Sequence, residues 1–148
     1  KKMGSLLKSL VLGFVAGVIA YLLVHEGVSL WLLNNGYATR VPWSMEPSLI
    51  TGSPQIIADA AWGGLWGAIF GLILGSVPKG SMTVRGAILG LVGTAVIGTL
   101  VALPLVHGQQ PFATVDVTTL WPVLVLGAVF GAATAWLYGF FTSGCRLP

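Results

Sequence analysis

The residues of this sequence that could do chemistry are two histidines, two carboxylates and one arginine: His25, Glu26, Arg40, Asp59 and His107. Histidine nitrogen and carboxylate oxygen are ligands for divalent metals. Two histidines on different helices are the minimum for haem ligation inside a helical bundle. A carboxylate inside a membrane can couple transport to protons or cations. The set therefore raises three hypotheses: a metal site, a haem site and a coupled transporter.

A purely structural polar cap is the fourth hypothesis. Asp59 is expected to cap the start of its helix, where a negative charge suits the positive end of the helix dipole. His25 and Glu26 are expected to hydrogen-bond Arg40 or the backbone of a nearby loop. No two of the histidines and carboxylates have the i, i+3 or i, i+4 spacing of a helical metal motif. No metal site and no cofactor are therefore predicted.

The composition identifies the medium in which these residues must work. The chain has 148 residues, of which 55% are hydrophobic and 7% charged, and its mean hydropathy is +0.91. Soluble domains carry about 25% charged residues, so this chain cannot cover a water-facing surface and is expected to lie in lipid. The net charge of +3 forms no basic stripe, which argues against nucleic-acid binding. The single cysteine, Cys145, excludes an internal disulfide framework.

Four apolar segments are expected to be transmembrane helices: residues 9–33, 56–77, 86–106 and 120–141. Each has the roughly 20 residues needed to cross a hydrocarbon core about 30 Å thick, and backbone in lipid must satisfy its own hydrogen bonds. The predicted fold class is all-α, a single four-helix transmembrane bundle over residues 1–148. Residues 34–55 are expected to form an outer loop, because prolines and glycines there forbid a long helix. Its apolar side chains favour a lid that lies along the outer bilayer surface or against another protein.

The charged residues predict the orientation of the bundle. Six of the seven cations fall on one side of it: Lys1, Lys2, Lys8, Lys79, Arg85 and Arg146. The carboxylates fall on the other side: Glu26, Glu46, Asp59 and Asp116. An excess of Lys and Arg marks the cytoplasmic side. We therefore expect both termini in the cytoplasm, the 34–55 loop outside, and a bacterial inner membrane as the location.

Helix periodicity predicts which of the candidate residues face the protein. His25 and Glu26 lie roughly 26 Å above Lys8 at a rise of about 1.5 Å per residue, near the outer interface. At about 100° per residue, Glu26 points well away from the face that carries Gly13 and Gly17, so it is expected either to pack against a second surface of the bundle or to reach headgroup water. Asp59 stands one turn before a ladder of glycines and continues it. Asp59 is therefore the candidate predicted to turn inward most clearly.

Glycines at four-residue spacing predict how the helices meet. Small residues let helix backbones approach closely in lipid, where packing supplies much of the association energy. Either these faces pack inside the bundle or one of them faces a partner protein. The helix-packing glycines are Gly13, Gly17, Gly63, Gly67, Gly71, Gly75, Gly86, Gly90, Gly127 and Gly131.

Three short stretches carry a resemblance to a known group of proteins. They are HEGV at residues 25–28, PWSMEP at 42–47 and AWGGLWG at 61–67. They resemble motifs of small four-helix inner-membrane proteins of bacteria that have no established activity. The resemblance implies a bacterial inner-membrane setting and assigns no catalytic residue.

These observations favour a structural or accessory subunit of a larger membrane complex, respiratory or otherwise energy-converting. The expected partners are the lipid bilayer and other membrane subunits, with no nucleic acid. No nucleophile–base set is found, so the chain is not predicted to be an enzyme. The first alternative is a small oligomeric proton- or cation-coupled transporter or channel that uses Glu26 and Asp59. The second is a haem- or metal-binding membrane protein that uses His25 and His107.

Overall fold

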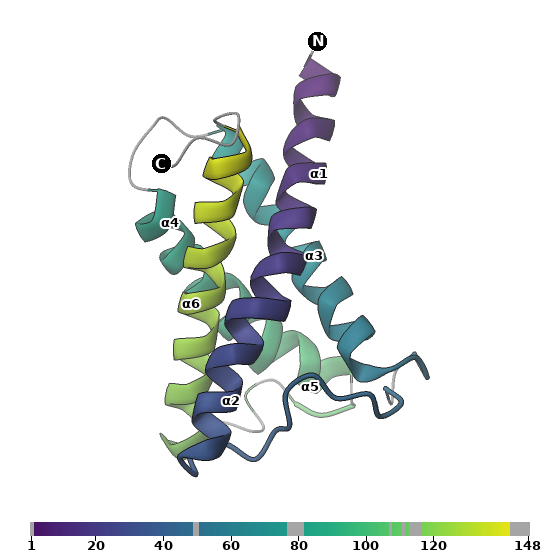
Figure 1. Cartoon of the computed structure of the whole chain (residues 1–148), viewed down its shortest axis with the longest axis vertical. Helices are drawn as coiled ribbons and strands as arrows, with labels where there is room; N and C mark the ends of the chain where they lie inside the picture. The colour runs from purple at the N-terminus through teal and green to yellow at the C-terminus, as the bar shows by residue number, and fades with distance from the viewer. Residues whose placement is uncertain are drawn as a thin grey trace.

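The computed structural model is all-helical in the residues it describes, which are 2–48, 51–76, 82–106, 108–110, 112 and 117–142 (Figure 1). Four helices are long and apolar enough to span a membrane, as the sequence predicts. The first consists of α1 (Lys2–Ala20), η1 (Tyr21–His25) and α2 (Glu26–Asn34), and the second is α3 (Gln55–Ser76). The third consists of α4 (Met82–Leu89), η2 (Gly90–Ala102) and α5 (Leu103–Val106), and the fourth is α6 (Val117–Thr142).

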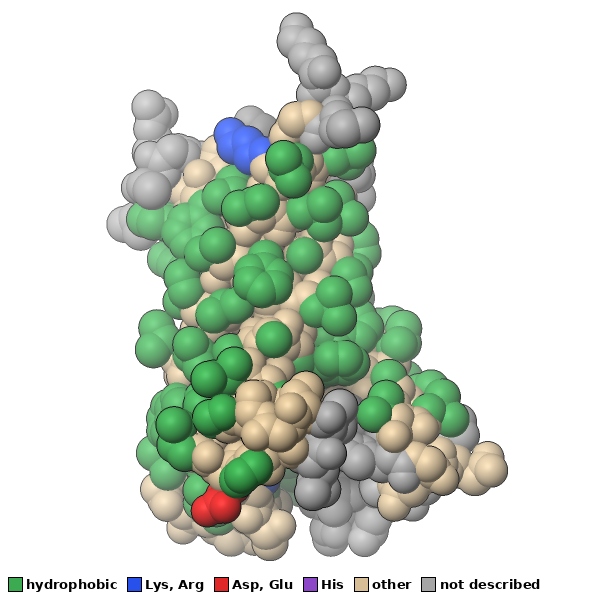
Figure 2. Space-filling model, turned by 90° about the vertical axis from the view of Figure 1, so that its right-hand side faces the viewer, with side chains coloured by type: hydrophobic (Ala, Val, Ile, Leu, Met, Phe, Trp, Pro, Cys, Tyr) green, Lys and Arg blue, Asp and Glu red, His purple; other side chains and the backbone are tan. Residues whose placement is uncertain are grey.

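The two ends of the bundle differ in what they carry. The start of α1 and the end of α6 lie at one end, and the segment 35–54 lies at the other with α5 (Figure 1). We call the latter the loop end. Hydrophobic side chains cover the flank of the bundle between a cationic side chain near one end and an acidic one near the other (Figure 2). This surface matches the apolar middle and polar ends that a membrane-spanning bundle needs.

The most extensive contact between the described helices joins α1 to α3 through glycine. A Cβ atom added to Gly13 would collide with the backbone oxygen of Gly67, and one added to Gly17 would collide with that of Gly63. The reverse holds for Gly67, where a Cβ would collide with the oxygen of Gly13. The two backbones therefore touch directly, which only residues without a side chain permit.

A second close pair joins α4 and η2 to α6. A Cβ at Gly90 would collide with the oxygen of Gly127, and a Cβ at Gly86 with the oxygen of Gly131. Gly75 borders instead on the hydroxyl groups of Ser9 and Tyr138, which hydrogen-bond each other. The glycine faces of these helices are thus occupied by contacts within the chain.

Two helices contain π-helical turns, which helix periodicity in the sequence does not predict. In η1 the N–H of Glu26 donates to the carbonyl of Tyr21, five residues back. Each such turn holds about one residue more than an α turn, so the residues after it are rotated by about 100°. This rotation decides between the two expectations for Glu26, which were packing against a second surface of the bundle and contact with headgroup water. An uninterrupted α-helix points it away from the glycine face, whereas in the structure it is fully buried beside Tyr21.

Candidate functional site

Glu26 is the centre of the polar site at the loop end. Its side chain has no exposed surface, and protein donors occupy all the acceptor positions of its carboxylate. Oε1 accepts from Nη1 of Arg40 at 2.9 Å and lies 3.1 Å from Nδ1 of His25. Oε2 accepts from the backbone N–H of Trp43 at 2.7 Å and from Nη2 of Arg40 at 3.3 Å. Four donors match the roughly four lone-pair sites of a carboxylate, so burial of this charge is compensated.

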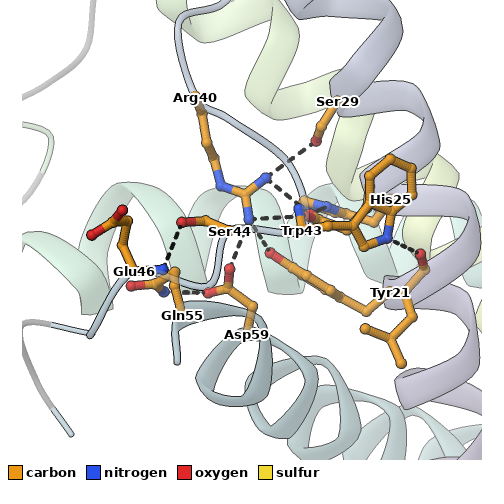
Figure 3. Close-up of polar contacts among 11 residues, drawn as sticks. Tyr21, His25, Ser29, Arg40, Trp43, Ser44, Glu46, Gln55 and Asp59 are labelled. Carbon is orange, nitrogen blue, oxygen red and sulfur yellow. Dashed lines mark hydrogen bonds and ion pairs between the residues drawn. The ribbon is translucent and has the colours of Figure 1, made fainter. Parts of the chain in front are cut away.

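Arg40 joins the loop to two helices. Besides Glu26, its Nη2 donates to Oδ2 of Asp59 at 2.7 Å and to the hydroxyl of Tyr21 at 3.1 Å, and Nη1 lies 3.5 Å from Oγ of Ser29. Figure 3 shows the guanidinium reaching from the loop toward these groups. Burial lowers the pKa of Arg40, but Tyr21, Glu26 and Asp59 outweigh it, and the pKa lies above its ordinary value. The side chain therefore stays cationic and clamps the loop to α1 and α3.

Asp59 occupies a different place from the one expected. It is the fifth residue of α3, not its cap, and its Oδ1 accepts from Nε2 of Gln55 at 2.7 Å. Its side chain is 18% exposed, whereas that of Glu26 is 0% exposed. Glu26, rather than Asp59, is therefore the candidate that turns inward most completely. The π turn is the reason, because it rotates Glu26 into the bundle.

Of the two candidate histidines, the structure describes only His25. His25 joins the site: besides its contact with Glu26, its ring stacks on Tyr21, with centroids 4.2 Å apart and planes at 15°. Phe130 of α6 approaches the same ring edge-on, with centroids 6.2 Å apart. His107 lies outside the described residues, so the haem hypothesis stays a prediction. Among the residues that the structure does describe, no three His, Cys, Asp or Glu side chains form a group that could hold a metal.

Trp43 fixes the loop at a second point, which sequence reasoning missed. Its indole N–H donates to the carbonyl of Leu22, inside η1, at 2.8 Å. Its backbone has φ of 51°, a left-handed conformation that is costly for a bulky residue. Its backbone N–H reaches Glu26 in this conformation. The two hydrogen bonds offset the strain and hold the loop against η1.

We expect Trp43→Phe to loosen the loop without unfolding the bundle. The variant keeps an aromatic ring but loses the bond to Leu22, which is worth about 1 kcal/mol. Faster amide hydrogen exchange of residues 40–46 measures the effect. Trp31→Phe is the control, because Trp31 is 56% exposed at the same end of the bundle. Unchanged exchange in Trp43→Phe would show that the indole does not hold the loop.

A cavity of about 550 Å³ lies beside this polar network. It is bounded by all four long helices and by the loop. Binding cavities for small organic molecules have roughly 300–1,000 Å³ and mostly apolar walls. The lining residues are Tyr21, His25, Arg40, Ser48, Thr51, Gln55, Ala58, Asp59, Trp62, Gly63, Trp66, Thr94, Ala95, Thr99, Val106, Val123, Leu126, Gly127 and Phe130.

The cavity wall includes an unsatisfied donor. Nε1 of Trp66 is buried and has no hydrogen-bond partner within the described part of the chain. An unpaired buried N–H costs about 1–3 kcal/mol. Sequence reasoning placed Trp66 only in a motif and gave no role to Tyr21. Ordinary helix periodicity is the signal that could have found both, since Tyr21 continues the four-residue spacing of Gly13 and Gly17, and Trp66 lies seven residues after Asp59 on α3.

No protein-family model, no curated protein and no solved structure matches this chain. The resemblance of its three motifs to small inner-membrane proteins of bacteria therefore stays a prediction. Inferences about the chemistry of this protein therefore rest on the geometry of the site.

Proposed function

We propose that this chain is a non-enzymatic membrane protein that binds a small, largely apolar molecule in the loop-end cavity. The cavity itself carries the proposal: about 550 Å³ of space at the junction of four helices. A bundle selected only for tight packing has no use for it, since interiors are normally close-packed. The Arg40 clamp and Trp43 hold the loop across this end and give the cavity a fixed wall.

The proposed setting is the bacterial inner membrane, with both termini in the cytoplasm and the loop end outside. The positive-inside rule supports this orientation, since Lys8 belongs to α1, which begins at the end opposite the loop (Figure 1), and Arg85 lies in the first turns of α4. The length and hydropathy of the four helices support insertion. In this orientation the cavity lies at the depth of the outer leaflet, where it is accessible to molecules dissolved in lipid.

We expect single cysteines introduced in a Cys145→Ser background to report this orientation. Met45→Cys, at a loop position that is 68% exposed, is expected to react with a membrane-impermeant maleimide added to intact cells. Lys8→Cys is expected to react only after the membrane is opened. The reverse pattern would place the loop end in the cytoplasm.

We expect a bulky side chain in the cavity to prevent ligand binding. Diphenylmethane, an apolar probe without polar atoms, should bind saturably to the protein in lipid nanodiscs, above its partition into empty nanodiscs. Ala58→Trp fills space that the cavity provides, so binding should fall to the empty-nanodisc level. Ala61→Trp is the matched control, on an exposed face of the same helix. Equal binding by wild type, Ala58→Trp and empty nanodiscs would reject the proposal.

An accessory subunit of a larger membrane complex, respiratory or otherwise energy-converting, is the second candidate. The observation that favours it is the loop, which exposes the large apolar side chains Tyr37, Val41, Trp43 and Met45. Exposed apolar patches of this kind mark contacts with protein or membrane. Purification in mild detergent separates the two candidates, because an accessory subunit should elute with larger partners and a binding protein alone.

The coupled-transport alternative requires a carboxylate that can exchange a proton or cation. In the structure Glu26 and Asp59 both bind Arg40. A carboxylate held by a permanent cation is a poor carrier, and this pairing favours a structural clamp over coupling. That alternative is tested by uptake in vesicles, which Glu26→Gln or Asp59→Asn should abolish if either group couples transport.

A further inference from the structure

We propose that the cavity binds a neutral ligand that carries a hydroxyl group, and that Nε2 of His25 accepts the hydrogen bond of this hydroxyl. The inference rests on the proposed binding function and names the class of ligand. The position of His25 carries it: the side chain lines the cavity and contacts Glu26 through its other ring nitrogen.

Glu26 fixes which nitrogen of His25 carries a proton. Arg40 donates to both carboxylate oxygens of Glu26, at 2.9 and 3.3 Å, so this carboxylate is ionised and can only accept. Nδ1 of His25 lies 3.1 Å from Oε1 and therefore carries the proton that it donates. In a neutral imidazole the other nitrogen then holds a lone pair. Nε2 is thus the acceptor of the ring.

Nε2 of His25 keeps accessible surface, unlike the indole nitrogen of Trp66. Tyr21 stacks on one face of the imidazole and Glu26 occupies its Nδ1 edge, but Nε2 makes no hydrogen bond within the described part of the chain. Among the described residues, Nε1 of Trp66 is the one buried side-chain nitrogen without a partner, so Nε2 is not fully buried. Its surface belongs to a side chain that lines the cavity and is 17% exposed.

The hydroxyl oxygens of Thr94 and Thr99 add acceptors to the cavity wall. Each hydroxyl already donates within its helix, to the carbonyl of Gly90 or of Thr94, so its oxygen can only accept from a ligand. A hydroxyl on the ligand can donate to such a wall, whereas an ether or a ketone oxygen cannot. Nε2 of His25 is the strongest of these neutral acceptors, because imidazole is more basic than an alcohol.

The charged groups beside His25 favour a neutral ligand over an ion. Asp59 also lines the cavity, but its two oxygens already accept from Gln55 and from Arg40. Arg40 in turn is shared between Asp59 and Glu26. An ion that entered here would lose its hydration and would have to compete for groups that are already paired. A hydroxyl group that is hydrogen-bonded in the cavity avoids most of this cost.

Matched probes test the role of the hydroxyl. The phenol para-phenylphenol and its methyl ether share two rings and an oxygen, and only the phenol can donate a hydrogen bond. In nanodiscs, after correction for partition into empty discs, wild type should bind the phenol about three- to tenfold more tightly, as one hydrogen bond predicts. Equal affinity for the two probes would overturn the inference. Tighter binding of the cation para-phenylbenzylammonium than of the phenol would also overturn it.

Two substitutions of His25 separate the roles of its nitrogens. In His25→Asn the amide nitrogen can take the place of Nδ1 and donate to Glu26, but nothing occupies the place of Nε2. In His25→Gln the longer side chain brings an amide oxygen to the place of Nε2 and loses the contact with Glu26. The hydroxyl preference should vanish in His25→Asn and persist in part in His25→Gln. A full preference in His25→Asn would overturn the role of Nε2.

Nitrogen NMR of histidine-labelled wild type tests the acceptor without any substitution in the protein measured. The chain has two histidines, so the signals of His25 are those that His25→Asn lacks. Nε2 should give the signal of an unprotonated nitrogen, and the phenol, but not its ether, should shift it. A proton on Nε2 in the ligand-free protein would overturn the inference.

An aliphatic pair distinguishes the source of the hydroxyl. Decanol and its methyl ether replace the aromatic rings by a chain, as in a lipid alcohol. A preference that depends on His25 in the aromatic pair alone assigns a phenol, and one in the aliphatic pair assigns a lipid alcohol. Saturable binding of every probe without a hydroxyl preference would overturn the inference and leave the binding function intact. Absence of saturable binding by any probe would overturn both.

Discussion

Replacement of Arg40 by methionine is expected to lower the free energy of unfolding by about 3 kcal/mol, the low end of the cost of breaking a buried ion pair. Methionine retains an apolar stem but removes both hydrogen bonds to Glu26. Glu26 is fully buried, so without Arg40 its charge has no contact with water in the folded protein. The low end applies because Arg40 itself keeps 40% of its side chain exposed. Unfolding in mixed micelles, followed by circular dichroism, measures the change.

Arg40 and Glu26 differ in exposure, and comparing the cost of replacing each one gives a sharper test. Glu26→Gln should cost less than Arg40→Met, because Arg40 keeps Asp59 and water as partners, whereas Glu26 without Arg40 keeps a buried charge. The double variant should recover part of the loss, since it removes both charges. Glu46→Gln is the matched control: Glu46 is exposed, and its neutralisation should change stability by less than about 0.5 kcal/mol. Equal costs for all three single variants would contradict a buried clamp.

Gly67→Ala is expected to cost about 3 kcal/mol, the upper end of the range for overpacking. The added methyl group would meet the backbone oxygen of Gly13 and lie 2.7 Å from Cα of Gly17. Neither obstacle is a side chain that can rotate away, so α1 and α3 must separate along their length. The same unfolding measurement detects the loss.

Gly27→Ala supplies the contrast for this prediction. Gly27 lies in α2, and a Cβ atom there would have nothing within 4 Å. Alanine is the better helix former by about 1 kcal/mol, so this variant should be unchanged or more stable. If Gly67→Ala lowers the free energy of unfolding and Gly27→Ala does not, the close approach of α1 and α3 is what requires Gly67. A loss of stability in both would instead point to a general intolerance of larger residues.

The number and position of the long helices could be predicted from the sequence. Residues 9–33, 56–77, 86–106 and 120–141 were expected, and the structure extends these helices by a few residues at most ends. Hydropathy predicts them well because a segment apolar and long enough to cross a membrane forms its backbone hydrogen bonds within itself, whatever its neighbours are. Helix ends are less certain, because caps and loops decide them.

The polar site could be predicted only in outline. Depth along the helices placed His25, Glu26, Asp59 and His107 in one layer together with Arg40 of the loop. The structure brings Arg40 together with His25, Glu26 and Asp59, and His107 lies outside the described residues. Helix periodicity ranked the inward turn of Asp59 above that of Glu26, because a uniform 100° per residue was assumed through residues 21–25. The π turn in η1 adds a residue there and rotates Glu26 inward. Nothing local in the letters YLLVH indicates that turn.

The sequence by itself determined the class of this protein: apolar segments of spanning length, cations gathered toward one side and carboxylates toward the other. These are properties of composition and spacing, and they act one segment at a time. Only the tertiary structure decided that Glu26 is buried under Arg40, that Trp43 ties the loop to η1, and that the indole N–H of Trp66 is buried without a partner among the described residues. Each of these depends on helices and a loop distant in sequence meeting at ångström scale, and the free energy of a buried charge or an unpaired N–H exists only once they meet.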